Sequence, residues 1–146
     1  MAKFFTPATD PLLFACPCKQ CPADFQVKPT ARLLAALDDL RAIYGRPIRV
    51  SSGVRCPAYN AKVGGASGSE HTTGDGADLF VASSPDRFDM LEKIFQVGIK
   101  RVGVGRGFLH VGTSPTLVSH VCWVYDPQPV PSDPRFYPII HPTPST

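Results

Sequence analysis

Two histidines and one aspartate have the types and spacing of a metal-ligand set. Asp78 follows His71 by seven residues, and His110 comes later in the chain. Two imidazoles and one carboxylate can hold a catalytic zinc ion while leaving its fourth position to water. The spacing suits a histidine on a loop and a carboxylate in the strand that follows, with Gly74 and Gly76 allowing a tight turn between them. We therefore predict a hydrolytic Zn2+ site at His71, Asp78 and His110.

Short strands are expected to position these ligands. The glycines at 103, 105 and 107 are typical of a hairpin rather than a phosphate loop, because their spacing is not Gly-x-Gly-x-x-Gly and no helix follows. Trp123, near the last strand, is expected in the core rather than as a sugar-stacking platform. The expected strands cover residues 48–52, 76–81, 101–104, 108–112 and 121–125.

Two helices are expected beside these strands. Leucines recur at helical spacing from Lys28 to Tyr44, and Gly45 ends that helix. The second helix is expected to have Ser84 as its cap and Pro85 at its first position. Its core-facing residues are predicted to be Phe88, Leu91, Ile94 and Phe95. Because strands and helices do not alternate regularly, the predicted fold class is a small α+β domain.

The chain divides into three parts by composition. Residues 1–27 are rich in proline and cysteine and are expected to form an irregular N-terminal cap. Residues 28–125 carry the expected helices and strands, and we predict that they form the catalytic domain. Residues 126–146 contain seven prolines and are expected to form an extended tail that wraps the domain or a partner.

Bulk properties limit the classes of partner. A chain of 146 residues with 43% apolar and 18% charged residues is typical of one soluble globular domain. Its net charge of +3 suits an anionic surface such as a cell wall but is too weak to indicate nucleic acid. Pro7 and Asp10 interrupt the N-terminus, and no run is long enough to cross a membrane. We expect synthesis in the cytoplasm without a signal peptide, and no membrane partner.

Five cysteines leave at least one unpaired within the chain. Cys16, Cys18 and Cys21 form a cluster, whereas Cys56 and Cys122 stand apart. The cluster suits three ligands of a structural zinc site with Cys56 as a candidate fourth. It also suits small buried thiols or one disulfide in an N-terminal loop. The second interpretation is favoured here, because the spacing is not that of paired Cys-x-x-Cys motifs.

The run Val50-Ser51-Ser52-Gly53-Val54-Arg55-Cys56-Pro57-Ala58-Tyr59-Asn60-Ala61-Lys62-Val63-Gly64-Gly65 leads directly into residues 69–78. Together these segments resemble the M15 zinc peptidases, which include D-Ala-D-Ala carboxypeptidases and phage endolysins. The small bacterial and phage M15A C-terminal group is the most similar, over roughly residues 24 to 125. This resemblance implies an antiparallel sheet with flanking helices, of the type shared by Hedgehog proteins and D-Ala-D-Ala peptidases.

The resemblance also implies roles for single residues. The family's zinc ligands fall on His71, Asp78 and His110, and its arginine falls on Arg55. Such an arginine stabilises the oxyanion or binds a substrate carboxylate. The alternative for Arg55 is a loop brace that pairs with Asp75 or Glu70. The family's serine, which positions the substrate backbone, falls on Ser69.

Two positions depart from the family pattern. Many relatives have an acidic general base three residues before the last histidine, where this chain has Gly107. The M15A group commonly has His-Val-Asp at the last ligand, where this chain has Gly112. Loss of a positioned base costs about two to four powers of ten in rate. The candidates to replace it are Glu70, Asp75 and His120, and Glu70 is taken as the catalytic residue.

The expected function is a zinc-dependent peptidase that hydrolyses a bond next to a D-amino acid in the peptidoglycan stem peptide. It would act on the cell wall as a phage endolysin or as a virion component, with phage tail or virion proteins bound through the proline-rich tail. The alternative is a catalytically weakened or inactive module that binds the wall or serves as a structural part of a phage tail. The two missing acids motivate this alternative.

Overall fold

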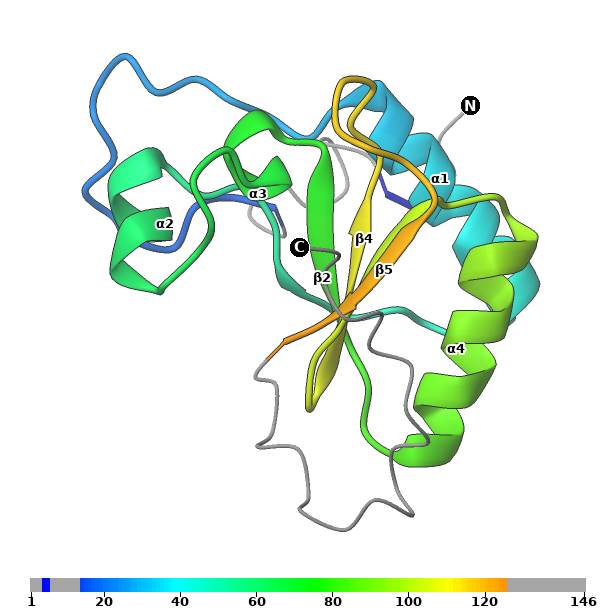
Figure 1. Cartoon of the computed structure of the whole chain (residues 1–146). Helices are drawn as coiled ribbons and strands as arrows, with labels where there is room; N and C mark the ends of the chain where they lie inside the picture. The colour runs from blue at the N-terminus through cyan, green and yellow to red at the C-terminus, as the bar shows by residue number, and fades with distance from the viewer. Residues whose placement is uncertain (1–3, 6–13, 126–146) are drawn as a thin grey trace, which may run out of the picture.

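The computed structural model describes residues 4–5 and 14–125 (Figure 1). The expected proline-rich tail and much of the expected N-terminal cap therefore lie outside the described residues. The elements follow in the order α1 (Ala31–Tyr44), β1 (Val50–Ser52), α2 (Pro57–Lys62), α3 (Glu70–Thr73), β2 (Gly76–Phe80), α4 (Ser84–Gln96), β3 (Arg101–Val104), β4 (Phe108–Gly112) and β5 (Val121–Val124).

The strands form one five-stranded sheet in the order β1-β2-β4-β3-β5. All neighbouring pairs are antiparallel except β3 and β5, which run parallel. The predicted hairpin forms between β3 and β4, where Gly105 N donates to Phe108 O. The predicted α+β class is confirmed, with a sheet that is mixed but mostly antiparallel.

Helices α1 and α4 cover one face of the sheet, and α2 and α3 lie on the other side (Figure 1). The main apolar core lies beneath α1 and α4, where leucine, isoleucine, valine and methionine side chains are almost completely buried. Burying such a side chain contributes about 1.5–3 kcal/mol. The core members from these elements include Leu33, Leu37, Leu40, Met90, Ile94, Ala77, Leu79, Val102, Leu109 and Val111.

The first helix begins three residues later than expected. Thr30 has an extended backbone, and its side chain accepts a hydrogen bond from Leu33 N, so it is the N-cap of α1. The helix ends at Gly45, as predicted, because this residue adopts the left-handed conformation with φ of 75°.

The second long helix differs from expectation at its cap and on its buried face. Ser83, not Ser84, is its N-cap, and its side chain accepts from Asp86 N. Phe88 and Phe95 are 73% and 55% exposed, so their predicted core positions are wrong. The predicted burial of Ile94 is confirmed, and Met90, four residues earlier on the same helical face, is buried with it.

One row of residues crosses the sheet from edge to edge. Ser52 pairs with Asp78, Asp78 with His110, His110 with Gly103, and Gly103 with Trp123. Directly opposed residues share a face of a sheet, and adjacent residues along a strand face opposite sides. Since Leu79 and Leu109 face the core, the row faces the side that carries α3.

None of the helices in the described ranges, 4–5 and 14–125, combines the length and the apolar character needed to span a membrane.

Candidate metal centre

Three elements bring the predicted ligands together. Asp78 and His110 lie opposite each other on β2 and β4. His71 was expected on a loop but lies on the one-turn helix α3. Ser69 is the N-cap of this helix, and its Oγ accepts from His71 N at 3.3 Å. Gly74 ends it in the left-handed conformation with φ of 80°, so the chain turns at once into β2.

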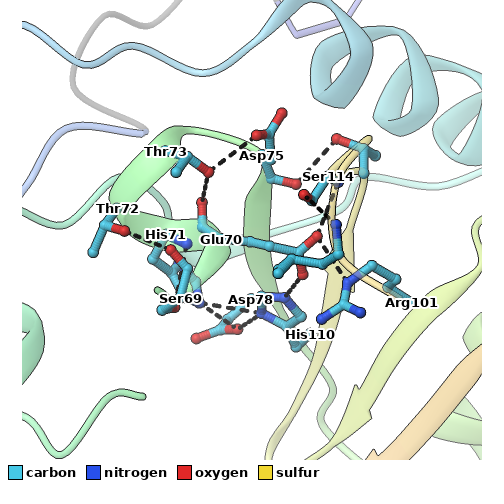
Figure 2. A network of polar contacts seen from close by, with 12 residues as sticks. Ser69, Glu70, His71, Thr72, Thr73, Asp75, Asp78, Arg101, His110 and Ser114 are labelled. Carbon is cyan, nitrogen blue, oxygen red and sulfur yellow. Dashed lines mark hydrogen bonds and ion pairs between the residues drawn. The ribbon is translucent and has the colours of Figure 1, made fainter. Parts of the chain in front are cut away.

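The side chains of His71, Asp78 and His110 point toward one another (Figure 2). His71 Nε2 is 3.1 Å and His110 Nδ1 is 2.9 Å from Asp78 Oδ1, and the two ring nitrogens are 3.2 Å apart. Zinc binds nitrogen and oxygen at about 2.0–2.1 Å, so tetrahedral ligand atoms are about 3.3 Å apart. The observed spacing therefore fits a single zinc ion.

The hydrogen bonds on the far side of each ring support this interpretation. His71 Nδ1 lies 2.6 Å from the carbonyl oxygen of Gly53, and His110 Nε2 lies 3.1 Å from Glu70 Oε2. Each of these acceptors requires a proton on the ring nitrogen that faces it. In neutral imidazoles the opposite nitrogens then carry lone pairs, and both point toward the carboxylate of Asp78. Three electron-pair donors at such a spacing can hold a metal cation, and the acceptors behind the two rings orient them as in known metal sites.

Arg55 holds the remaining oxygen of Asp78. One terminal nitrogen donates to Asp78 Oδ2 at 2.9 Å, while Nε donates to Ser52 Oγ and the other terminal nitrogen to Asn60 Oδ1. Arg55 therefore braces a ligand and does not pair with Asp75 or Glu70, the partners considered from the sequence. A guanidinium has five N–H donors, so two remain for a substrate.

Asp78 stays ionised although it is buried. Burial raises the pKa of Asp78, but its hydrogen bonds with His110 and His71 lower this pKa well below its usual range. The carboxylate is thus negatively charged at neutral pH, as metal binding requires.

Glu70 has both carboxylate oxygens engaged. Oε2 faces His110 Nε2, and Oε1 accepts from Ser114 N at 2.9 Å and pairs with Arg101 Nε at 3.0 Å. Burial raises the pKa of Glu70, but the hydrogen bonds from His110 and Ser114 and the ion pair with Arg101 lower it more. These contacts are typical of a residue that positions His110. The role of Glu70 as a general base stays a prediction.

The other two candidates for the base lie elsewhere. Asp75 accepts hydrogen bonds from the hydroxyl groups of Thr30 and Thr73 and from Arg32. His120 is exposed, and its ring contacts Ser119. Neither side chain lines the cavity that contains the ligand group.

The ligand group forms part of a cavity of about 680 Å³. Arg55, His71, Asp78 and His110 line it, together with the loop of residues 63–69. The remaining lining residues are Glu70, Arg101, Phe108, Leu117, Trp123 and Tyr125.

Sequence reasoning missed the aromatic wall of this cavity. Trp123 is half-buried and lines the cavity, so its expected core position is wrong. Its ring lies 5.5 Å from that of His110, and Arg101 lies over its face at 5.4 Å. Gly103 makes this packing possible, because a Cβ there would lie 2.7 Å from the indole. A glycine between two valines of a strand was the sequence feature that could have indicated a bulky side chain packed against this position.

The fold and the site define a small α+β protein with a buried His-Asp-His group open to a cavity, as in hydrolases with one catalytic metal. The family model of Peptidase M15 matches residues 10–112, and the chain belongs to this family. This finding confirms the resemblance inferred from the sequence, and family membership implies a metallopeptidase. Comparison with curated proteins gave no significant match.

Proposed function

We propose that the protein is a zinc-dependent peptidoglycan peptidase that hydrolyses a stem-peptide bond next to a D-amino acid. The observation that carries this proposal is the convergence of His71 Nε2, Asp78 Oδ1 and His110 Nδ1 on one point in the cavity. When bound there, zinc supplies a Lewis acid for the scissile carbonyl and lowers the pKa of water. M15 family membership supports the peptidase activity.

The residues around the ligand group prepare the site for that chemistry. Gly53 O and Glu70 fix the two rings, so that each presents a lone pair. Arg55 holds Asp78 in place and keeps two N–H donors for the oxyanion of the transition state or for a terminal carboxylate. Donors placed in advance cost little reorganisation during the reaction.

The shape of the cavity suits an extended peptide. Its volume of about 680 Å³ lies within the range of about 300–1,000 Å³ for small-ligand sites. Residues 63–69 form one wall, and their three glycines together with Ala66, Ser67 and Ser69 leave main-chain groups accessible to a substrate backbone. Trp123 and Tyr125 provide an apolar surface for the substrate side chains. Ser69 lies at the end of this wall, where a role in orienting the substrate peptide is part of the proposal.

The wall as the place of action is part of the same proposal. The net charge of +3 favours association with an anionic polymer. We propose that the protein reaches the wall during phage lysis or as a virion component. The proline-rich segment of residues 126–146 would then attach it to tail or virion proteins.

Digestion of purified cell walls tests the proposal. With Zn2+, mass analysis of the products is expected to show new amino termini or released D-alanine. Chelator and the His71→Ala substitution are expected to abolish both. His120→Ala is the matched control, because this exposed histidine lies outside the cavity and its loss is expected to leave turnover unchanged. Absence of products with any divalent metal would contradict the enzymatic proposal.

A second candidate is a non-catalytic module that retains zinc and binds the wall. One observation favours it: among the described residues, the carboxylates lining the cavity are Glu70 and Asp78, and both are engaged by neighbouring side chains. Neither is free to act as a base in this arrangement. Position 107, where many relatives carry an acid, is glycine.

Zinc binding and turnover measured together separate the two candidates. A module without activity is expected to sediment with purified walls and to bind zinc, yet to release no product. Introducing Gly107→Glu distinguishes them further, because nothing lies within 4 Å of a Cβ at this position. A gain of turnover in this variant would support a site that lacks only its base.

A further inference from the structure

Four of the five cysteines meet at a second place in the molecule. Cys16, Cys18 and Cys21 come from the segment before α1, and Cys56 is the N-cap residue of α2. The four Sγ atoms all lie within 4.8 Å of one another. The fifth, Cys122, lies on β5 and is exposed. A chance grouping of four thiols from two distant segments is improbable, so the cluster needs an explanation.

The sulfur spacing matches a metal site and not a disulfide. Cys18 Sγ is 3.3 Å from Cys21 Sγ and 3.7 Å from Cys56 Sγ. A disulfide bond is about 2.0 Å long. Four thiolates around zinc, each at about 2.3 Å, lie about 3.8 Å apart at the corners of a tetrahedron. All four sulfurs are needed for a closed structural site, and all four are present.

The backbone around the cluster is shaped for thiolates. Gln20 N donates to Cys18 Sγ at 3.4 Å, and Cys56 N donates to Cys16 Sγ at 3.3 Å. Such donors stabilise the negative charge of a thiolate. Lys19 adopts the left-handed conformation with φ of 58°, which few residues with a side chain do. This turn folds Cys21 back toward Cys18.

We propose that Cys16, Cys18, Cys21 and Cys56 bind a structural zinc ion, separate from the ion of the His-Asp-His group. Each site uses its own set of side chains, so either can be emptied without removing a ligand of the other. Four protein ligands leave no position for water, which makes this site structural rather than catalytic.

The proposed ion joins the N-terminal segment to the loop that supports the other site. Val54 N donates to Phe14 O at 2.7 Å, and Gly53 packs so closely that a Cβ there would lie 2.6 Å from Phe14 Cα. Gly53 O is the acceptor for His71, and Arg55 holds Asp78. Cys56 follows directly, so the cysteine site fixes the end of the segment that carries both contacts.

Metal analysis of the purified full chain tests the proposal. About two zinc ions per chain are expected in the native protein, and about one in the His71→Ala, Asp78→Ala double variant. Cobalt replacing the remaining ion in that variant is expected to give the intense thiolate-to-metal charge-transfer bands of a sulfur-ligated site. About one zinc in the native protein, lost in the double variant, would overturn the proposal.

Substitution of the cysteines gives a matched comparison. Cys18→Ser with Cys21→Ser is expected to lose one zinc ion, whereas Cys122→Ser is expected to retain both. Should the Cys18→Ser, Cys21→Ser protein fail to fold, the reactivity of the thiols in the native protein still tests whether the cluster binds zinc. Cys122 is expected to react at once with a thiol reagent, and the other four only after chelator is added. Four or five rapidly reacting thiols in the zinc-loaded protein, or a disulfide within the cluster, would overturn the proposal.

Discussion

The carboxylate of Glu70 fills the space in which a side chain at Gly112 would lie. A Cβ on Gly112 would be 2.0 Å from Glu70 Oε2, and this same oxygen faces His110 Nε2. The M15A group that the chain resembles commonly has aspartate at this position. In this protein the acidic group beside the last histidine therefore comes from α3 instead of β4.

Replacing Gly112 with alanine is expected to displace the Glu70 carboxylate. Because His110 then loses its partner, zinc affinity should fall by about 10–100-fold, and overpacking should lower the free energy of unfolding by about 1–3 kcal/mol. Zinc titration and denaturant unfolding measure the two effects. Gly107→Ala is the control on the same hairpin, with nothing within 4 Å of its Cβ and an expected change within about 0.5 kcal/mol. Equal effects of the two substitutions would contradict this account.

Glu70→Gln separates a positioning role from a catalytic one. Glutamine keeps the length of the side chain but removes the charge that faces His110 and Arg101. If Glu70 positions the ligand, zinc affinity is expected to fall by about 10–100-fold, and saturating zinc should restore much of the turnover. If Glu70 is the base, kcat should fall by about two to four powers of ten with zinc affinity unchanged. Zinc titration combined with wall digestion distinguishes the outcomes.

Arg55→Lys is expected to lower activity even though the charge is retained. A lysine ammonium cannot replace the planar fork that contacts Ser52, Asn60 and Asp78 together. Loss of an oxyanion donor costs about 10²–10³ in kcat, and turnover at saturating zinc measures it. Arg32→Lys is the control, since Arg32 is exposed and pairs with Asp75. Full activity of the Arg55→Lys protein would exclude a role for the guanidinium in the reaction.

Zinc binding is expected to weaken as the pH falls, because protons compete for the ring of His110. Burial lowers the pKa of His110, but its hydrogen bonds with Asp78 and Glu70 raise this pKa by more, so it lies above its ordinary value. Competition should therefore begin at a pH higher than the ordinary value of about 6.5. In the metal-free protein, folding stability has the opposite pH dependence. The stabilisation by protonated His110 is complete below the pKa of the unfolded state and is lost as the pH rises through the pKa of the folded state.

Zinc affinity measured across this range checks the pH prediction. In Glu70→Gln the fall is expected to move to lower pH, because one of the two carboxylates that favour the protonated ring is gone. A zinc affinity that does not change with pH would show that no proton is displaced from His110.

Removal of zinc is expected to lower the melting temperature. A ligand at a hundred times its dissociation constant adds about 2.7 kcal/mol to the free energy of unfolding. Thermal unfolding with and without chelator measures this difference. His71→Ala should reduce the effect of chelator, and the part that remains should report the cysteine site. An unchanged melting temperature in chelator would contradict zinc binding at both sites.

Much of the site could be predicted from the sequence, because its ligands sit in local motifs. His71 and Asp78 are fixed by one helical turn and a glycine, and the apolar residues around His110 indicate a strand. The contacts of Glu70 could not be predicted in the same way. They depend on the small residues Gly76 and Gly112, which leave room for a side chain from another element.

Two other failures have a common physical origin in tertiary packing. The helix α4 has apolar residues on more than one face, and periodicity cannot show that Met90 faces the sheet while Phe88 and Phe95 face solvent. Trp123 reaches the cavity only because β5 pairs in parallel with β3. Strand order is a property of the whole chain, and no local pattern near Trp123 records it.

The two histidine rings are anchored in different ways. The ring of His71 is hydrogen-bonded to the main-chain oxygen of Gly53, which no side-chain substitution removes. The ring of His110 is hydrogen-bonded to the side-chain carboxylate of Glu70, which a substitution can remove. Point mutations can therefore retune one nitrogen donor while the other keeps its tautomer, which makes His110 the ligand through which metal affinity is most readily adjusted.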